Sequence, residues 1–216
     1  MAKDLKSTLK NLSDSGYKLI ESFEYNNGEN IEEKIARAGE VGIEYLIVPY
    51  VGPQKDKPEK TIDDYKRIAE SFNVWGEMCK KNNVKLAYHN HDYSFTKLEG
   101  QYPQDIFMQQ TDPNLVYFQM DIYWVITAGE DPVQWVKKYP NRFKLCHVKD
   151  RMSGQPITEK NASCVLGTGI IDFKKILPVL KADGMQYFIV EQERYDTQTP
   201  LESMRLNAEY MKKWNI

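Results

Sequence analysis

Short apolar segments alternate with amphipathic helical segments along the chain, and this alternation most restricts the possible fold. Runs that are apolar at consecutive positions are typical of strands buried on both faces of a parallel sheet. The expected strands are 18–23, 45–50, 84–89, 116–120, 143–148 and 187–190. The expected helices are 4–15, 30–41, 61–82, 103–110, 131–138, 172–180 and a last one that begins at Pro200. The pattern predicts an α/β fold, which a doubly wound sheet and a (β/α) barrel satisfy equally well.

Two of the expected helices carry signals for their ends or faces. Thr61 is followed three residues later by Asp64, which resembles a capping box at the start of the longest helix. Pro200 suits the first turn of a helix. In that last helix we expect the apolar side to face inward, with Leu201, Met204, Ala208 and Met211 on it.

The composition excludes several classes of protein. The 216 residues carry 29 basic and 31 acidic side chains, so the net charge of −2 gives no reason to expect a nucleic acid or an anionic membrane as partner. No apolar run approaches the length of a membrane span, and the first residues are too charged for a signal peptide. The three cysteines form no CxxC pair, which favours a reducing compartment. We therefore expect a soluble, cytoplasmic protein with a single domain over residues 1–216.

Ionisable residues cluster where the last four expected strands end. These are His89-Asn90-His91-Asp92, Asp121, His147-Val148-Lys149-Asp150 and Glu191-Gln192-Glu193, and they include all three histidines of the chain. In a parallel barrel the carboxyl ends of all strands open onto one face, where active sites lie. Asp, His and Glu from separate strands are ligand types of Mn, Co, Zn or Mg sites.

A structural role is the main alternative for any one of these residues. A single histidine at a strand end is more often a hydrogen-bonded structural residue than a ligand. Cys146 precedes His147, so strand alternation predicts that it points to the opposite face and packs in the core. Four strand ends that all carry ionisable residues are hard to explain by packing alone, which favours a functional site.

Five segments, in this order, resemble the sugar phosphate isomerase/epimerase family with the xylose isomerase-like TIM barrel. They are YHNHDY (88–93), QMDIYWV (119–125), HVKD (147–150), GTGIIDF (167–173) and IVEQ (189–192). The resemblance runs through essentially the whole chain. It implies a (β/α)8 barrel, a divalent metal and a sugar or sugar derivative as substrate.

The resemblance also implies a set of metal ligands. The family's ligands on its last three strands correspond to Asp121, His147 and Glu191. Related sequences often read His-Asn-His-x-x-Glu-Phe, and this chain has Ser94 where that Glu is common. His89, His91 and Asp92 are the candidates to replace it.

The implied reaction begins with removal of a proton next to a carbonyl that a metal polarises. Glu191 is the expected base, and His91, Asp92 or Glu193 is the expected second acid or base. Lys149 is an alternative electrophile that stabilises the enediolate. Substrate contacts are expected from Glu21, Asn90, Asp92, Trp124, Asp150 and Glu193.

The chain is short for such a barrel. A complete barrel has eight strands and about 250 residues, whereas six strands are expected here. Aligned with the family, strands one and three are missing, which leaves unpaired sheet edges. A truncated copy that completes itself as a homo-oligomer, a fragment and an incompletely recorded sequence all account for this.

The leading functional hypothesis is a sugar isomerase or epimerase. Dehydration of a cyclic keto-polyol is a close variant that uses the same proton abstraction. A DNA-repair endonuclease of the same superfamily is a weaker rival, because the chain offers three histidines and a net charge of −2. From another class, a carbohydrate-binding or interaction protein could retain the fold without catalysis.

Overall fold

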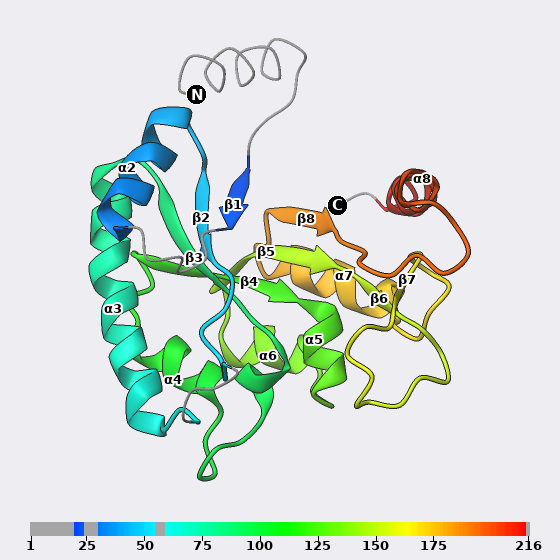
Figure 1. Cartoon of the computed structure of the whole chain (residues 1–216), viewed down its shortest axis with the longest axis horizontal. Helices are drawn as coiled ribbons and strands as arrows, with labels where there is room; N and C mark the ends of the chain where they lie inside the picture. Colours follow the sequence, from blue (N-terminus) through cyan, green and yellow to red (C-terminus); the bar gives the residue numbers. More distant parts are fainter. Residues whose placement is uncertain (1–19, 24–29, 55–58, 215–216) are drawn as a thin grey trace.

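The computed structural model describes residues 20–23, 30–54 and 59–214, and its centre is one parallel sheet of six strands. The strands are β1 (Glu21–Phe23), β2 (Tyr45–Val48), β3 (Lys85–His89), β4 (Val116–Asp121), β5 (Phe143–Val148) and β8 (Tyr187–Val190), paired in that order. Helices line the outside of the curved sheet (Figure 1). The fold is an incomplete TIM barrel, as the sequence predicts: in the described part of the chain, β1 and β8 are the edges of the sheet and do not pair with each other.

The helices occupy the connections between the strands of the sheet, except the last one, which follows β8. They are α2 (Ile31–Val41), α3 (Ile62–Lys81), α4 (Pro103–Gln110), α5 (Ile122–Thr127), α6 (Pro132–Lys138), α7 (Phe173–Ala182) and α8 (Pro200–Met211). A 3-10 turn, η1 (Asp92–Phe95), follows β3, and a small antiparallel pair, β6 (Asp150–Arg151) and β7 (Ser163–Cys164), follows β5. The expected helix 4–15 and the start of the strand expected at 18 lie outside the described residues.

Local signals explain most of the boundaries. The capping box at Thr61 is present, because Thr61 Oγ1 accepts from the backbone N–H of Asp64 and Asp64 accepts from that of Thr61. Helix α5 is a difference from the sequence prediction. It begins directly at the end of β4, where Asp121 caps it, and no glycine or proline separates the two elements.

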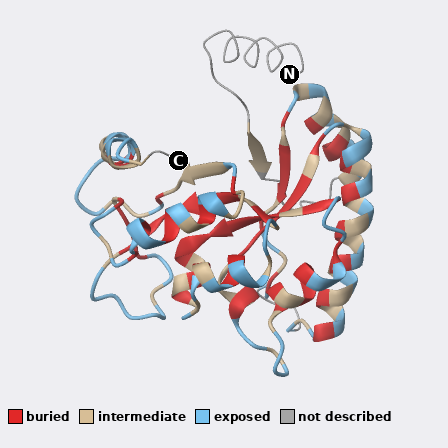
Figure 2. Ribbon diagram, turned by 180° about the vertical axis from the view of Figure 1, so that it is seen from behind, coloured by how far each residue is buried: buried red, intermediate tan, exposed pale blue. Residues whose placement is uncertain are grey.

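The four central strands, β2 to β5, are mostly buried on both faces, whereas the edge strands β1 and β8 are only partly buried (Figure 2). On the side that faces the helices, a large core includes Cys146, which confirms its predicted orientation. On the concave side, Tyr45, Ile47, Ala87 and Leu145 form a smaller apolar cluster. The polar strand ends lie on the concave side too, since they alternate with the residues of the large core.

Helix α8 does not bury the side that its sequence indicates. Leu201 is 82% exposed and Met204 is 37% exposed, whereas Ser203 and Asn207 are the buried residues of this helix. Asn207 donates to Gln192 Oε1 at 2.9 Å and accepts from the backbone N–H of Leu166 at 2.8 Å. The prediction was wrong for Leu201, Met204 and Ala208, because this part of α8 packs through polar contacts with loops, whereas Met211 packs against the core as predicted.

Candidate metal centre

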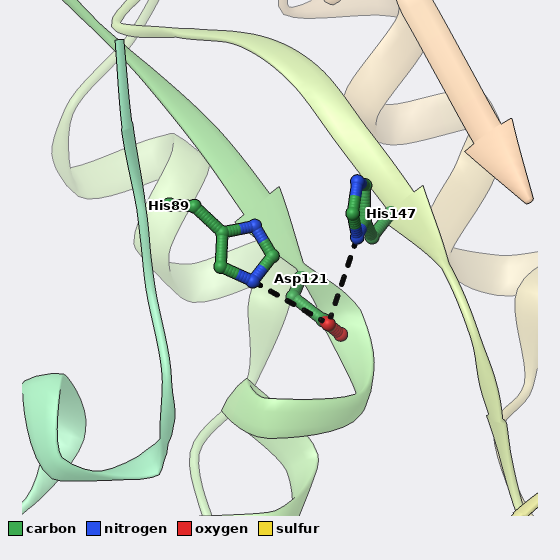
Figure 3. Close-up of side chains that lie close together, drawn as sticks. All are labelled: His89, Asp121 and His147. Carbon is green, nitrogen blue, oxygen red and sulfur yellow. Dashed lines mark ion pairs between the residues drawn. The ribbon is translucent and has the colours of Figure 1, made fainter. Parts of the chain in front are cut away.

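Three buried side chains from neighbouring strands meet on the concave side of the sheet. They are His89 at the end of β3, Asp121 at the end of β4 and His147 on β5 (Figure 3). The register places Asp121 beside His147 and Gln119 beside His89. Asp121 Oδ2 lies 3.8 Å from His89 Nε2 and 4.0 Å from His147 Nδ1. One ligand atom from each residue lies within 4.8 Å of the other two, so the three could hold a metal ion.

The two carboxylate oxygens of Asp121 have different surroundings. Oδ1 caps helix α5 by accepting from the backbone N–H groups of Tyr123, at 2.9 Å, and of Trp124, at 3.4 Å. Oδ2 is buried and has no hydrogen-bond partner. Burial raises the pKa of Asp121 to about 7, although Lys149 and His147 act in the opposite direction. A buried acceptor without a donor fits a cation, because such a group is otherwise costly.

His147 lies between two carboxylates. Its Nδ1 is 3.2 Å from Glu191 Oε2, and its Nε2 is 3.3 Å from Glu21 Oε1. Burial lowers the pKa of His147, but the two glutamates outweigh it and raise the pKa to about 10. Burial also raises the pKa of Glu191, yet the facing His147 and Lys149 hold that pKa well below its usual value. Glu191 is therefore an ionised carboxylate beside the three-residue cluster.

His89 is in the opposite situation, because burial and the nearby imidazoles of His147 and His91 hold its pKa well below the usual value. Its Nδ1 is 2.8 Å from Gln119 Oε1, which leaves Nε2 on the side of Asp121. A neutral imidazole with a fixed hydrogen bond at one nitrogen is the form that binds metals.

A pocket of about 230 Å³ adjoins the cluster. Its lining residues are Pro49, His89, His91, Trp124, Lys149, Glu191 and Glu193. The ring of His91 lies 5.2 Å from that of Trp124 and 5.1 Å from that of Tyr50, and its buried Nδ1 has no hydrogen-bond partner. Burial and the positive charge of Lys149 lower the pKa of His91 to about 4, so this imidazole is neutral near pH 7.

Lys149 is the buried cation of the pocket wall. Its Nζ lies 3.2 Å from Glu191 Oε2, also contacts Glu193, and sits 5.3 Å from the ring centre of Trp124. Burial lowers the pKa of Lys149, but Asp121 and the two glutamates outweigh it and raise the pKa to about 12. The ammonium is thus retained inside the protein as a hydrogen-bond donor.

Other residues predicted as substrate contacts have protein partners. Asn90 donates to the carbonyl of Asp121 at 3.2 Å and accepts from its N–H at 3.1 Å, so it ties β3 to β4. Asp92 pairs with Lys160 at 2.6 Å. The carboxylate of Asp150 accepts from the backbone N–H groups of Arg151, Gly167, Gly169 and Ile171. The pocket lining does not include these three residues.

Ser94 does not belong to the three-residue cluster. It is buried in η1, and its hydroxyl lies 2.7 Å from Tyr88 Oη. Tyr88 precedes His89 on β3 and belongs to the helix-side core, so Ser94 faces away from the cluster. Ser94 is therefore not part of the group formed by His89, Asp121 and His147.

Gln119 belongs to the site but was not among the predicted site residues. Gln119 lies two residues before Asp121 on β4, so both side chains point to the concave side. That spacing was the available signal.

Comparisons with known proteins agree with this architecture. The family model described as xylose isomerase-like TIM barrel matches residues 23–214. Inosose dehydratase from Clostridium tetani is 32% identical over 153 residues, which are 65% of this chain and 51% of that protein. Inosose dehydratase from Clostridium perfringens strain 13 is 33% identical over 165 residues, which are 70% of this chain and 55% of that protein. The chain thus spans about half the length of these curated relatives.

Solved structures extend the comparison. A sugar phosphate isomerase/epimerase from Parabacteroides distasonis superposes with a TM-score of 0.78 and 27% identity, over 96% of this chain and 75% of that one. The IolI protein with a bound zinc atom has a TM-score of 0.77 over 98% and 83% of the two chains, and at 14% identity it shows the shared fold alone. In the described part of the chain, every helix is too short or too polar to cross a membrane.

Proposed function

Since the chain belongs to the xylose isomerase-like TIM barrel family, we propose that it is a metal-dependent enzyme that modifies a sugar or keto-polyol next to a carbonyl group. The observation that carries the proposal is Asp121 Oδ2, a buried acceptor without a hydrogen-bond donor that faces two imidazoles. The substrate class rests on the names of the relatives, inosose dehydratase and sugar phosphate isomerase/epimerase.

The metal would be held by His89, Asp121 and His147, with Glu191 as a further ligand beside His147. Two imidazole nitrogens and carboxylate oxygens suit Zn, Mn or Co, and suit Mg less because Mg prefers oxygen ligands. When bound, such an ion supplies Lewis-acid polarisation of the carbonyl, which makes the neighbouring C–H acidic.

Glu191 is the proposed base. Its ionised carboxylate lines the pocket, so it can accept the proton from the carbon next to the carbonyl. His91 is the proposed second acid or base, because it is neutral and its Nδ1 has no hydrogen-bond partner. Lys149 is placed to donate a hydrogen bond to the oxygen on which negative charge develops.

Two outcomes follow from the same proton abstraction. Return of the proton to another face or atom gives epimerisation or isomerisation, and loss of a neighbouring hydroxyl group gives dehydration. The inosose dehydratases found among the curated relatives support a cyclic keto-polyol and the second outcome.

The pocket walls suggest how such a substrate is held. The rings of Trp124 and His91 can pack on the apolar face of a sugar, and Glu193 can accept hydrogen bonds from its hydroxyl groups. Glu193 pairs with Lys149 and is half-exposed, so it can exchange this partner for a ligand.

Three further expectations stay predictions. They are the single domain over residues 1–216, the homo-oligomer and the cytoplasmic location.

A second candidate is a carbohydrate-binding protein that has lost catalysis. The two open edges of the sheet favour it, since the barrel is incomplete in the described part of the chain. It predicts a sugar that binds without proton exchange.

Hydrogen exchange separates the two candidates. The purified protein, loaded with zinc or manganese, is incubated in D₂O with inosose and with simple ketoses, and deuterium on carbon is measured by NMR. We expect the wild type to incorporate deuterium, and we expect the rate in Glu191→Gln to be lower by at least ~100-fold. The matched control is Glu40→Gln, on the exposed surface of α2, which should retain the wild-type rate. A sugar that binds without exchange in any variant would support the second candidate.

A further inference from the structure

The imidazoles of the candidate metal centre are linked behind the cluster by two further side chains. His89 Nδ1 lies 2.8 Å from Gln119 Oε1, and Gln119 Nε2 donates to Glu21 Oε2. The other oxygen of Glu21, Oε1, lies 3.3 Å from His147 Nε2. The result is one continuous series of hydrogen-bond partners, His89–Gln119–Glu21–His147, with Glu21 coming from edge strand β1 and His147 from β5.

The chemistry of these groups gives the series a direction. A carboxylate accepts hydrogen bonds and donates none, so Gln119 must turn its NH₂ group toward Glu21. The carbonyl of Gln119 then faces His89, and the imidazole must carry its proton on Nδ1 to donate to it. The lone pair of His89 Nε2 is thereby directed toward Asp121 Oδ2, 3.8 Å away.

The same carboxylate orients the second imidazole. His147 Nε2 donates to Glu21, and its Nδ1 lies 3.2 Å from Glu191 Oε2 and 4.0 Å from Asp121 Oδ2. Carboxylates that hold the outer nitrogen of a metal-binding histidine fix its ring orientation and tautomer. A single residue thus controls both nitrogens that face the candidate site.

We propose that Glu21 is a positioning residue that sets the tautomer of His89 through Gln119 and the orientation of His147 directly, so that one nitrogen of each ring faces the candidate metal site. This inference rests on the metal site in the proposed function. It also explains why a three-residue edge strand carries a carboxylate on the concave side.

The variant Glu21→Gln reverses the series while keeping the shape of the side chain. The oxygen of the new amide accepts from His147, so its NH₂ group faces Gln119. Gln119 then turns over, presents its oxygen to position 21 and donates to His89 Nδ1. The proton of His89 moves to Nε2, where it blocks the nitrogen that would bind metal.

Two readouts follow this change. Nitrogen-15 NMR of the metal-free protein should show His89 protonated at Nδ1 in the wild type and at Nε2 in Glu21→Gln. Zinc titration by calorimetry should show an affinity ~10–100-fold lower in Glu21→Gln. Thermal unfolding of the metal-free proteins checks that both are folded.

The double exchange Glu21→Gln with Gln119→Glu is the matched rescue. A carboxylate at position 119 accepts from His89 Nδ1 and from the amide at position 21, whose oxygen accepts from His147. The Nδ1 tautomer and most of the zinc affinity should return, which a role in packing alone does not predict.

The outcomes distinguish this inference from the proposed function. A wild-type protein that binds no zinc overturns the proposed function. In that case the NMR measurement of the His89 tautomer in the metal-free protein still tests the hydrogen-bond series. The inference is overturned if wild-type His89 carries its proton on Nε2, or if Glu21→Gln changes neither the tautomer nor the zinc affinity. The wild-type tautomer provides that test even if the variant fails to fold.

Discussion

Asp121 and Asp150 are two buried aspartates at the ends of neighbouring strands, and their carboxylates have different partners. Both oxygens of Asp150 are saturated by backbone N–H groups at 2.8–3.2 Å, which fold the segment 151–171 around it. Only one oxygen of Asp121 has such partners, and the other faces two imidazoles. The comparison teaches that the loop after a strand can occupy both oxygens of a buried carboxylate or leave one without a donor, and in our proposal this second oxygen binds the metal.

The largest effect on stability is expected from Asp150→Asn. The amide has one acceptor oxygen and turns an NH₂ group toward backbone donors, so buried N–H groups lose their partner. We expect the free energy of unfolding, measured by denaturant titration, to fall by about 3 kcal/mol. Equal stability of the variant and the wild type would show that the loop does not depend on Asp150.

Asp121→Asn should weaken metal binding and leave the stability of the protein intact, in contrast to Asp150→Asn. Loss of a charged ligand is expected to weaken zinc binding ~100-fold or more in calorimetric titration. This loss is at least as large as that caused by removing a side chain that hydrogen-bonds to a metal ligand. The stability of the metal-free protein should be unchanged or higher, because burial disfavours the ionised form of this carboxyl and raises its pKa to about 7. A variant that binds zinc as tightly as the wild type would remove the distinction between the two aspartates.

Gly169→Ala tests how closely the chain packs around Asp150. A Cβ at this position would lie 2.2 Å from the carbonyl oxygen of Arg151 and 2.3 Å from Asp150 Oδ1, so the loop must shift. We expect a loss of about 1–3 kcal/mol in unfolding free energy. Ser153→Ala, at an exposed position of the same loop, is the control and should change stability little.

The smallest effect is expected at Asp64, a surface counterpart of the capping oxygen of Asp121. Hydrogen bonds from Thr61 and Arg67 lower the pKa of Asp64 to about 2. Its stabilising effect is therefore complete above the ordinary pKa of 3.8 and is lost as the pH falls through about 2. Asp64→Asn should lower the melting temperature slightly at pH 7. The difference from the wild type should vanish below a pH of about 2, where Asp64 is protonated. A difference that is independent of pH would show that the charge is not involved.

Much of the fold could be predicted because it depends on local patterns. Apolar runs indicated the strands, and the parallel arrangement implied that Asp121 and His147 lie near each other. Alternation along a strand likewise predicted that Cys146 points away from the site, and the core confirms it.

What the sequence could not predict depends on geometry between distant segments. The sequence places Ser94 where related sequences often have Glu, but it has no clear signal for the turn η1, which directs Ser94 to Tyr88. The contact between Glu21 and His147, 126 residues apart, depends on how the open sheet curves. Asn207 rather than Leu201 faces inward on α8 because loop partners decide that face.

The most direct test of the proposed metal site is the anomalous scattering of zinc in crystals of the zinc-loaded protein. We expect one strong peak at bonding distance, about 2.0–2.2 Å, from His89 Nε2, Asp121 Oδ2 and His147 Nδ1. A peak elsewhere, or the same peak in crystals of Asp121→Asn, would contradict the claim that the buried oxygen of Asp121 is kept for a metal.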